Sequence, residues 1–478
     1  MTKLIHLNAF DMNCVGHIQQ GLWTHPRDQS MRYLDIHYWT DYARRLEAGL
    51  FDGIFFADVL GVYDVLGGSP DAAVKGAVQV PVNDPMLLIP AMAAVTQHLG
   101  FGVTANLTYE APFQFARRMS TLDHLTNGRI GWNIVTGYLD SAARAIGLSG
   151  QTAHDDRYDL ADEYMALVYK LWEGSWEDDA VQRDRTTGVY ADPAKVHLIH
   201  HKGPQYKLDA MHLSEPSVQR TPVLYQAGSS ARGSRFAATH AECVFLNGQS
   251  QQGVRTIVDS IRAQAVGLGR AASDIKMFLG ATVITAQTDR EAQEKFAEYQ
   301  RYASSEAALV HAAASLGIDF NKYDLDEPVE TGKSQAIVSN VQAMSRSAGP
   351  QWTRRKLLEQ MVMGGRQKPW VGGADTIADL LIQWSTDADV DGFNLARTVS
   401  PECFDDFIAL VVPRLQERGA FKTAYAAGKA GVAGNAAETV ASGARGTSGT
   451  SGGSLRANLF GQNHLGAFHP AAKYRVTG

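Results

Sequence analysis

Short apolar runs alternate along the chain with longer segments in which apolar residues recur every three or four positions. The clearest run is 130–135, which follows an Asn-Gly turn at 127–128 and ends in the small and polar residues 136–138. A run of this kind, with a turn before it and polar residues after it, is typical of a buried parallel strand. An amphipathic segment at 113–125 precedes the turn, so this part of the chain predicts a helix followed by a strand.

Further apolar runs extend the pattern over most of the chain. They predict strands at 3–10, 51–58, 100–106, 221–227, 242–247, 276–284 and 392–396. Between them, helical spacing predicts helices at 38–46, 84–98, 139–172 and 228–240, from 289 onward, and at 404–415. Eight strands that alternate with helices favour an α/β fold of the (β/α)8 or TIM-barrel type over an open doubly wound sheet, and no GxGxxG follows the first strand.

Three segments interrupt the alternation and are interpreted as insertions in one barrel that spans 1–423. We expect the second to contain loops and a short hairpin and the third to be mostly helical; they cover about 59–83, 175–220 and 304–368. Residues 424–454 are almost entirely small or polar and cannot bury enough apolar area to offset their ordering entropy. Apolar residues return from 455 onward, so 424–478 is predicted to be a flexible linker and a C-terminal docking arm. The arm docks either on a neighbouring subunit or on its own barrel.

Composition narrows the class of protein. The 478 residues carry a net charge of −6, which argues against a nucleic-acid-binding protein. No stretch approaches the ~20 apolar residues that span a bilayer, and the alternating N-terminal run predicts a strand and not a signal peptide. Cys14, Cys243 and Cys403 are far apart, which suggests neither a disulfide framework nor a cysteine zinc site. We therefore expect a soluble cytoplasmic protein without a membrane partner.

Polar residues follow several of the predicted strands. Asp58, Asn106 and the segment from Asn133 to Thr136 lie at or near the carboxyl ends of the second, third and fourth strands. In a barrel these ends converge on one mouth, where active sites form. Each residue alone is more often an ordinary loop start, but their coincidence favours a site.

The sequence QAGSSARG at 226–233 predicts an anion-binding turn. A strand ends, Gly228 turns the chain, and Ser229 and Ser230 open a helix whose free N–H groups suit a phosphate. Arg232 would add positive charge. The alternative is a plain serine N-cap after a glycine turn.

Two groups of residues are candidates for the pocket wall. Cys14, His17, Tyr63 and Gln79 follow the first strand or lie in the long loop after the second. His17 could give or take a proton near neutral pH, although a lone loop histidine is more often a surface residue.

Other histidines allow further interpretations. His154 and Tyr158 either cap a helix or face a ligand, and His311 in a helical insertion could reach over the mouth. The histidines at 197–212 invite a metal site, but no HxH or HExxH on a predicted strand or helix supports one. We therefore expect no metal.

Taken together, these stretches resemble the bacterial-luciferase-like flavin monooxygenases, in the branch of nitrilotriacetate and dibenzothiophene-sulfone monooxygenases. The resemblance runs from about 3 to 418 and touches the terminal LRANLFG and HPAAKYR. The combination of TLDHL, NGR and GWNIVT with QAGSS makes it specific. It is carried by NAFDMNCVGH (8–17), FDGIFFAD (51–58), RRMSTLDHLTNGRIGWNIVTGY (117–138), HDDRYDLADEY (154–164) and QAGSSARG (226–233).

The resemblance implies a barrel that binds reduced FMN (FMNH2), supplied by a separate NADH-dependent flavin reductase, and that reacts with O2 through a C4a-peroxyflavin. It also implies a homo-oligomer, dimer or tetramer. Phosphate is expected at Ser229 and Ser230 with help from Tyr158. The candidate cofactor-binding residues are Asp58, Asn106, Asn133, Thr136, His154, Tyr158, Ala227, Gly228, Ser229 and Ser230.

The resemblance further implies a substrate pocket. Tyr138 occupies a position where an alkane-oxidising relative is expected to have histidine, which fits a different substrate. The candidate catalytic and pocket-lining residues are Cys14, His17, Tyr63, Gln79, Tyr138 and His311.

These candidates lack a basic cluster, which favours a small neutral substrate over an aminopolycarboxylate. Within the branch, the start of the chain and the stretches FADVLGVYDV (56–65) and QVPVNDP (79–85) resemble members that act on dimethyl sulfide. The resemblance therefore implies a reaction that converts dimethyl sulfide and O2 to methanethiol and formaldehyde. Alternatives with the same chemistry are an aryl sulfone, an alkane or an S-substituted cysteine. Alternatives from other classes are a metal-dependent barrel hydrolase built on the histidines at 197–212 and a non-catalytic flavin-binding protein.

Overall fold

The computed structural model describes residues 3–228, 230–329, 353–363, 365, 367–425 and 453–476. Within these residues parallel strands close into a barrel, which confirms the predicted (β/α)8 fold. In β1, Asn8 lies opposite Gly53 of β2 on one side and Asn394 of β13 on the other, and pairing of β10 with β11 closes the ring. The barrel strands are β1 (His6–Met12), β2 (Gly53–Ala57), β3 (Gly100–Asn106), β4 (Ile130–Val135), β9 (Val223–Gln226), β10 (Cys243–Leu246), β11 (Lys276–Ala286) and β13 (Gly392–Ala396).

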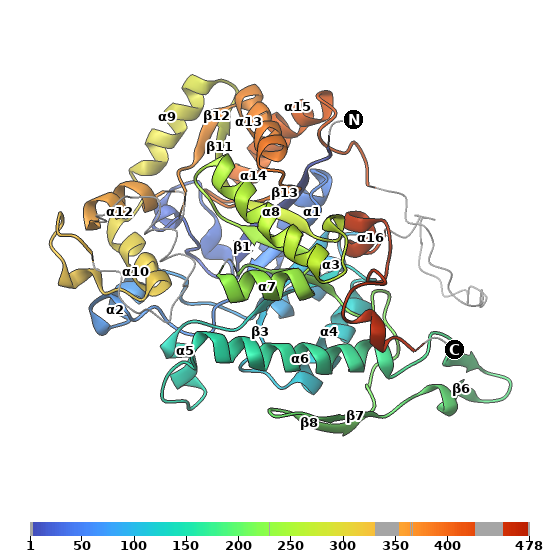
Figure 1. Ribbon diagram of the computed structural model, residues 1–478. Helices are drawn as coiled ribbons and strands as arrows, with labels where there is room; N and C mark the ends of the chain where they lie inside the picture. Colours follow the sequence, from blue (N-terminus) through green and yellow to red (C-terminus); the bar gives the residue numbers. More distant parts are fainter. Residues whose placement is uncertain are drawn as a thin grey trace.

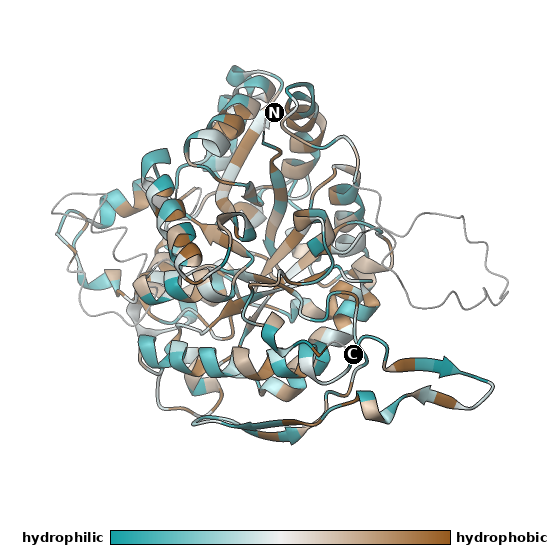
Figure 2. Ribbon diagram, turned by 45° about the vertical axis from the view of Figure 1, so that its right-hand side comes forward, coloured by the Kyte–Doolittle hydropathy of each residue, from teal (hydrophilic) through white to brown (hydrophobic). Residues whose placement is uncertain are grey.

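Helices surround the barrel with their apolar faces inward and their polar faces outward (Figures 1 and 2). In α1 the side chain of Asp35 accepts a hydrogen bond from the His37 N–H, and the helix ends at Gly49, so both termini are capped as helix physics requires. Its buried face consists of an apolar stripe at helical spacing. The surrounding helices are α1 (Ile36–Ala48), α3 (Ile89–Ala93), α4 (Pro112–Leu125), α6 (His154–Gly174), α7 (Ala231–His240), α8 (Gln251–Gly267), α9 (Asp289–Gln300), α13 (Ala374–Asp387), α14 (Glu402–Asp406) and α15 (Val412–Glu417).

Short 3-10 turns and a π turn connect or extend these elements. The predicted helix at 404–415 is continuous but contains the π turn η8 (Phe407–Val411) between α14 and α15. The 3-10 turns outside the insertions described below are η1 (Leu22–Thr24), η2 (Ser30–Arg32), η4 (Pro85–Leu87) and η6 (Ala272–Asp274).

The predicted helix at 84–98 is wrong in its extent. Asp84 does cap its start, because its carboxylate accepts the Met86 N–H at 2.8 Å, but only η4 and the short α3 follow. The buried guanidinium of Arg129 donates to the carbonyl oxygens of Ala93 and Thr96 at 3.0 and 3.1 Å. These carbonyls therefore find partners without a further helical turn.

The predicted helix at 139–172 is also interrupted. It divides into α5 (Asp140–Ala145) and α6, with Gly147 between them at φ +88°. A left-handed backbone conformation of this kind ends a right-handed helix. The break lets His154 begin α6 as a separate element.

The first two insertions carry more structure than expected, and the described part of the third is helical as predicted. The first contains η3 (Leu66–Gly68) and α2 (Asp71–Gly76), and the third contains α10 (Ser305–Leu316), η7 (Phe320–Lys322) and α12 (Arg354–Met361), which lie together at one side of the molecule (Figure 1). Residues 330–352 of the third insertion lie outside the described part. The second contains two hairpins where one was predicted, with η5 between them: β5 (Val181–Asp184), β6 (Val189–Ala191), η5 (Pro193–Lys195), β7 (Ile199–Lys202) and β8 (Lys207–Ala210).

One strand outside the insertions was not predicted. β12 (Trp370–Gly373) pairs in parallel with the distal half of β11, where Val283 lies opposite Trp370. β11 extends to Ala286, beyond the predicted end of the seventh strand, because it has two successive partners, β13 and then β12.

The C-terminal segment 453–476, called the arm below, packs on the barrel of the same chain. It contains α16 (Leu455–Phe460) and η9 (Ala472–Tyr474). Leu455 lies beside Gly100 at the start of β3 and donates its N–H to the Gly128 carbonyl at 2.8 Å. The arm therefore covers the amino-terminal end of the barrel, whereas most of the predicted linker, 426–452, lies outside the described residues.

Candidate active site

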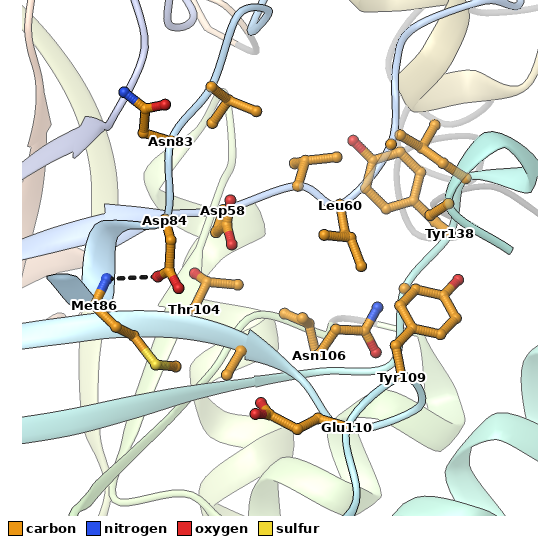
Figure 3. A pocket seen from close by; sticks show the side chains of 18 of the residues that line it. Asp58, Leu60, Asn83, Asp84, Met86, Thr104, Asn106, Tyr109, Glu110 and Tyr138 are labelled. Atoms are coloured by element: carbon orange, nitrogen blue, oxygen red, sulfur yellow. Dashed lines mark hydrogen bonds between the residues drawn. The ribbon is translucent and has the colours of Figure 1, made fainter. Parts of the chain in front are cut away.

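Two adjacent cavities lie at the carboxyl ends of the barrel strands. The inner cavity has a volume of about 230 Å³ and is floored by the aromatic side chains of Phe10, Phe55 and Phe245. The outer cavity, about 440 Å³, lies over the ends of β3 and β4 and reaches the surface at the half-exposed Leu60 (Figure 3). The residues that line both cavities are Asp58, Val59, Thr104, Val135 and Tyr138.

Most of the pocket candidates from the sequence line the inner cavity: His17, Tyr63, Gln79, Tyr138 and His311. The Tyr63 hydroxyl donates to the Gln79 side-chain oxygen and lies 2.9 Å from the Tyr138 hydroxyl. The His311 ring, on α10, is 5.8 Å from the Tyr63 ring. The first and third insertions thus bring polar groups together over the barrel mouth.

His17 is 3% exposed and packs edge-on against Phe10, with ring centroids 4.7 Å apart. Burial, together with the positive charge of Arg397 and the nearby His311, lowers the pKa of His17 well below its ordinary value. The imidazole is therefore neutral at physiological pH. The lowered pKa counts against the expectation that His17 exchanges a proton near neutral pH.

Cys14 is not among the residues that line either cavity. It is fully buried, its Sγ lies 3.3 Å from the Gly16 carbonyl oxygen, and burial raises the pKa of the thiol to about 12. Cys14 therefore remains a thiol and shapes the turn that carries His17.

Arg397, which the sequence analysis missed, holds that turn. Its Nε lies 2.8 Å from Asp11 Oδ1, and both side chains are almost completely buried. Its Nη2 donates to the carbonyl oxygens of Cys14 and Val15 at 3.0 and 2.6 Å. An arginine directly after the apolar run GFNLA, at the carboxyl end of β13, was the available signal.

Asp58 and Asp84 lie on one wall of the outer cavity (Figure 3). Burial, and secondarily the negative charge of Asp84, raises the pKa of Asp58 to about 7. Asp84 was expected only as a helix cap, and it keeps that role.

The candidates on β3 and β4 differ in position. Asn133 lines the inner cavity and donates from Nδ2 to Thr104 Oγ1 at 3.0 Å. Asn106 lines the outer cavity, and its side-chain oxygen accepts the Thr108 N–H at 3.0 Å. Thr136 lies outside both linings, and its carbonyl oxygen accepts the Thr108 hydroxyl at 2.9 Å. Thr136 thus helps to build the wall that Asn106 presents.

The turn for which anion binding was predicted lies at the start of α7. Ser230 is the N-cap, with its Oγ accepting the Gly233 N–H at 3.0 Å, and Ala227 lines the inner cavity. The Gly228 N–H donates to the Gln226 side-chain oxygen at 2.8 Å. Ser229 lies outside the described residues.

His154 and Tyr158 on α6 face this turn. His154 Nε2 is 3.5 Å from Ser230 Oγ. A Cβ atom on Gly228 would lie 2.7 Å from the Tyr158 hydroxyl oxygen, so a larger residue would displace Tyr158 from the turn. Serine, tyrosine and histidine groups therefore converge on a helix N-terminus, which is the donor set that a phosphate monoester needs.

Arg232 does not add its charge to the turn as expected. Its guanidinium lies 3.0 Å from Asp159 and 2.6 Å from Asp162, and stacks over the Tyr158 ring. The two carboxylates balance the positive charge of the guanidinium, and its position over the ring orients Tyr158.

The histidines at 197–212 do not form one cluster. His197, His200 and His201 pair with Glu177, Asp209 and Glu163, and His212 lies 2.9 Å from Ser120 Oγ. Among the described residues no group of three or more histidine, cysteine or acidic side chains is arranged to hold a metal ion. In that same part of the chain no helix is long and apolar enough to cross a membrane.

Comparison with known proteins agrees with this geometry. The family described as luciferase-like monooxygenase matches residues 12–389. The chain belongs to the luciferase-like monooxygenase family. Members of this family are flavin-dependent monooxygenases that use reduced FMN, and the convergent donors at the start of α7 fit its phosphate.

Several similar proteins differ in substrate. The dimethyl-sulfide monooxygenase of Hyphomicrobium sulfonivorans is 47% identical over 99% of this chain and 94% of its own. The long-chain alkane monooxygenase of Geobacillus thermodenitrificans is 50% identical over 90% of this chain and 93% of its own. A crystal structure of riboflavin lyase with modified FMN and riboflavin superimposes with a TM-score of 0.88 at 36% identity and covers 99% of this chain and 100% of that protein.

Proposed function

We propose that this luciferase-like enzyme oxidises dimethyl sulfide with reduced FMN and O2, yielding methanethiol and formaldehyde. The observation that carries the proposal is the small inner cavity, capped by Tyr63, Gln79 and Tyr138, beside an anion-binding turn at α7. The 47% identity to a dimethyl-sulfide monooxygenase across 99% of the chain supports the substrate.

The chain supplies the binding and the shielding. Ser230 and the free N–H groups at the start of α7 would hold the FMN phosphate, with Tyr158 and His154 beside it. Bound reduced FMN supplies the electrons with which O2 is activated. The ring would then lie toward the two cavities, in reach of Asp58 and Asn133.

The aromatic floor of the inner cavity excludes water from the reacting atoms. Phe10, Phe55 and Phe245 line it, and α10 covers it with His311. Water exclusion favours oxygen transfer over release of hydrogen peroxide.

The inner cavity has room for a small substrate. Its volume is about 230 Å³, and a cavity needs only roughly 10–15 Å³ on this measure to hold one water molecule, so the three heavy atoms of dimethyl sulfide fit. The hydroxyl groups of Tyr63 and Tyr138 make the wall of this cavity more polar. A thioether, whose sulfur can accept a hydrogen bond, fits such a wall better than an alkyl chain does.

We also propose that a separate NADH-dependent flavin reductase supplies the reduced FMN, and that the enzyme works in the cytoplasm as a dimer or tetramer. These proposals follow the resemblance in sequence. Gel filtration with light scattering tests the oligomer, and pull-down with a purified reductase distinguishes docking from free diffusion of FMNH2.

A substrate panel tests the function. The purified enzyme receives photochemically reduced FMN, O2 and one of dimethyl sulfide, an aryl sulfone, an alkane series or riboflavin, and products are identified by mass. We expect methanethiol and formaldehyde from dimethyl sulfide. Turnover of long alkanes alone, or of riboflavin alone, would show that this compound and not dimethyl sulfide is the substrate. Hydrogen peroxide as the only product with every compound would reject the monooxygenase proposal.

A further inference from the structure

We propose that Asp58 carries protons from the outer cavity to the inner cavity, and that Asp84 is the positioning charge that keeps Asp58 ready to donate. This inference rests on the proposed function and assigns its acid. It gives Asp58 the proton-donor role that the sequence suggested for His17, because burial and Arg397 keep the His17 imidazole neutral.

The position of Asp58 is what first suggests the role. It follows β2 at the mouth of the barrel and is one of the few residues that line both cavities. The outer cavity reaches solvent beside Leu60, and the inner one contains Tyr63 and Gln79. A carboxyl group in the shared wall contacts both the water supply and the reacting space.

Asp84 supplies the electrostatic asymmetry. Its Oδ1 accepts the Met86 N–H at the start of η4, which fixes the carboxyl group at the wall of the outer cavity. Asp58 is more deeply buried, and the nearby Asp84 charge further opposes its ionisation. A buried carboxyl group beside a second acid therefore keeps its proton to higher pH than an isolated one.

The other ionisable groups near this wall do not cancel the effect. In the outer cavity Glu110 forms an ion pair with Arg118, so the pair is close to neutral. Cys14, on the turn after β1, stays a thiol. The phenols of Tyr109 and Tyr138 are uncharged at neutral pH.

The proton balance of the reaction is complete. Dimethyl sulfide, O2 and FMNH2 give methanethiol, formaldehyde, water and FMN, and the two hydrogens of the water are balanced by the two that FMNH2 loses. Asp58 would give its proton to the oxygen that leaves as water and would regain one through the outer cavity, while the reduced flavin would release one to solvent, so no net proton is consumed. No electrons pass through the carboxyl group, and it returns to its initial state after each cycle.

Two isosteric variants separate the roles. Asp84→Asn removes the charge but keeps an N-cap, because asparagine caps helices as well as aspartate. Asp58→Asn keeps the size and the oxygen acceptor of the side chain but has no proton to exchange. Asp71→Asn is the matched control, since it neutralises an exposed aspartate at the start of α2, in the first insertion, which lies between Asp58 and Asp84 in the sequence.

The first measurement is the methanethiol yield per reduced FMN as a function of pH. Because Asp58 must be protonated to donate, we expect the wild-type yield to fall as pH rises through about 7. Asp84→Asn should move this fall to lower pH, because it removes a negative charge that opposes ionisation of Asp58. Asp58→Asn should give a low yield without the fall, and Asp71→Asn should match the wild type.

The second measurement is infrared titration of the flavin-free protein, which does not depend on activity. The carboxylic C=O band that Asp58→Asn removes should disappear near pH 7 in the wild type and at lower pH in Asp84→Asn. If the wild type forms product and Asp84→Asn has the same pH profile of methanethiol yield, the assignment of Asp58 and Asp84 is overturned and the proposed function still stands. An Asp58 band that disappears near pH 4, its ordinary range, also overturns it. A normal infrared titration without product from any thioether counts against the proposed function alone.

Discussion

Arg456 anchors the arm to the barrel, and its removal gives the largest stability change that we predict. Its side chain is 0% exposed and its Nε lies 2.7 Å from Glu242 Oε1. It also donates to the carbonyl oxygens of Thr221, Pro222 and Asn463 at 2.9, 3.0 and 2.9 Å. The guanidinium thus joins the arm to the start of β9 and β10.

Arg456→Met should destabilise the protein by about 3–5 kcal/mol, the range for breaking a buried ion pair, because it leaves the Glu242 carboxylate buried without its cation. The remaining donor to Glu242 in the barrel is the Leu224 N–H at 3.1 Å. Arg456→Met combined with Glu242→Gln removes that charge while keeping the acceptor. The double variant should therefore recover at least about 1 kcal/mol of the loss.

Equilibrium unfolding in urea, followed by tryptophan fluorescence, measures these differences, and limited proteolysis reports release of the arm. Phe468→Ala is the control in the same segment, because that side chain is 73% exposed and should change stability by less than about 0.5 kcal/mol. A loss below about 1 kcal/mol for Arg456→Met would refute the anchoring role.

The arm also bears on the site. Leu455 and Leu459 belong to the same buried cluster as Phe55 and Phe245, which floor the inner cavity. Loosening the arm should therefore raise hydrogen peroxide release per reduced FMN. Unchanged coupling in a variant whose arm is cleaved would show that the floor stands without the arm.

Three further substitutions test the site. Ser230→Ala should weaken FMN binding by ~1.5–3 kcal/mol, one hydrogen bond to a charged group, measured by anaerobic titration; unchanged affinity would remove Ser230 from the phosphate site. Arg397→Lys keeps a charge beside Asp11 but cannot reach both loop carbonyl oxygens. The product yield per reduced FMN should therefore fall roughly tenfold, which corresponds to about one hydrogen bond. A yield equal to that of the wild type would contradict the role of Arg397 in holding the turn after β1. Tyr138→Phe removes the 2.9 Å contact with the Tyr63 hydroxyl and should raise KM for dimethyl sulfide roughly fivefold, about 1 kcal/mol; a change in kcat alone would argue for a chemical role.

The barrel could be predicted from sequence because each strand is a local apolar run with its own turn signals. Asp84 as a cap followed from local chemistry in the same way. The ends of α3 and the turn after β1 could not be predicted, since Arg129 and Arg397 satisfy carbonyl oxygens that are distant in sequence. The order of residues along the chain does not show which distant residues meet in the fold.

The same limit applies to the candidate site. Polar residues at strand ends identified Asp58 and Asn133, but the proximity of Asp84 to Asp58 arises only when the first insertion folds back on the mouth. The neutral state of His17 likewise depends on burial in the folded chain and, after that, on Arg397, about 380 residues away in the sequence. Residue types were predictable, whereas their ionisation depended on tertiary packing.

The most direct test of the account is a single turnover without any reductase. Enzyme in excess is mixed anaerobically with photochemically reduced FMN, then with O2 and dimethyl sulfide, and methanethiol is quantified against hydrogen peroxide by gas chromatography and a peroxide assay. The account predicts close to one methanethiol per reduced FMN. Complete conversion of the reduced FMN to hydrogen peroxide, with no thiol formed, would contradict it.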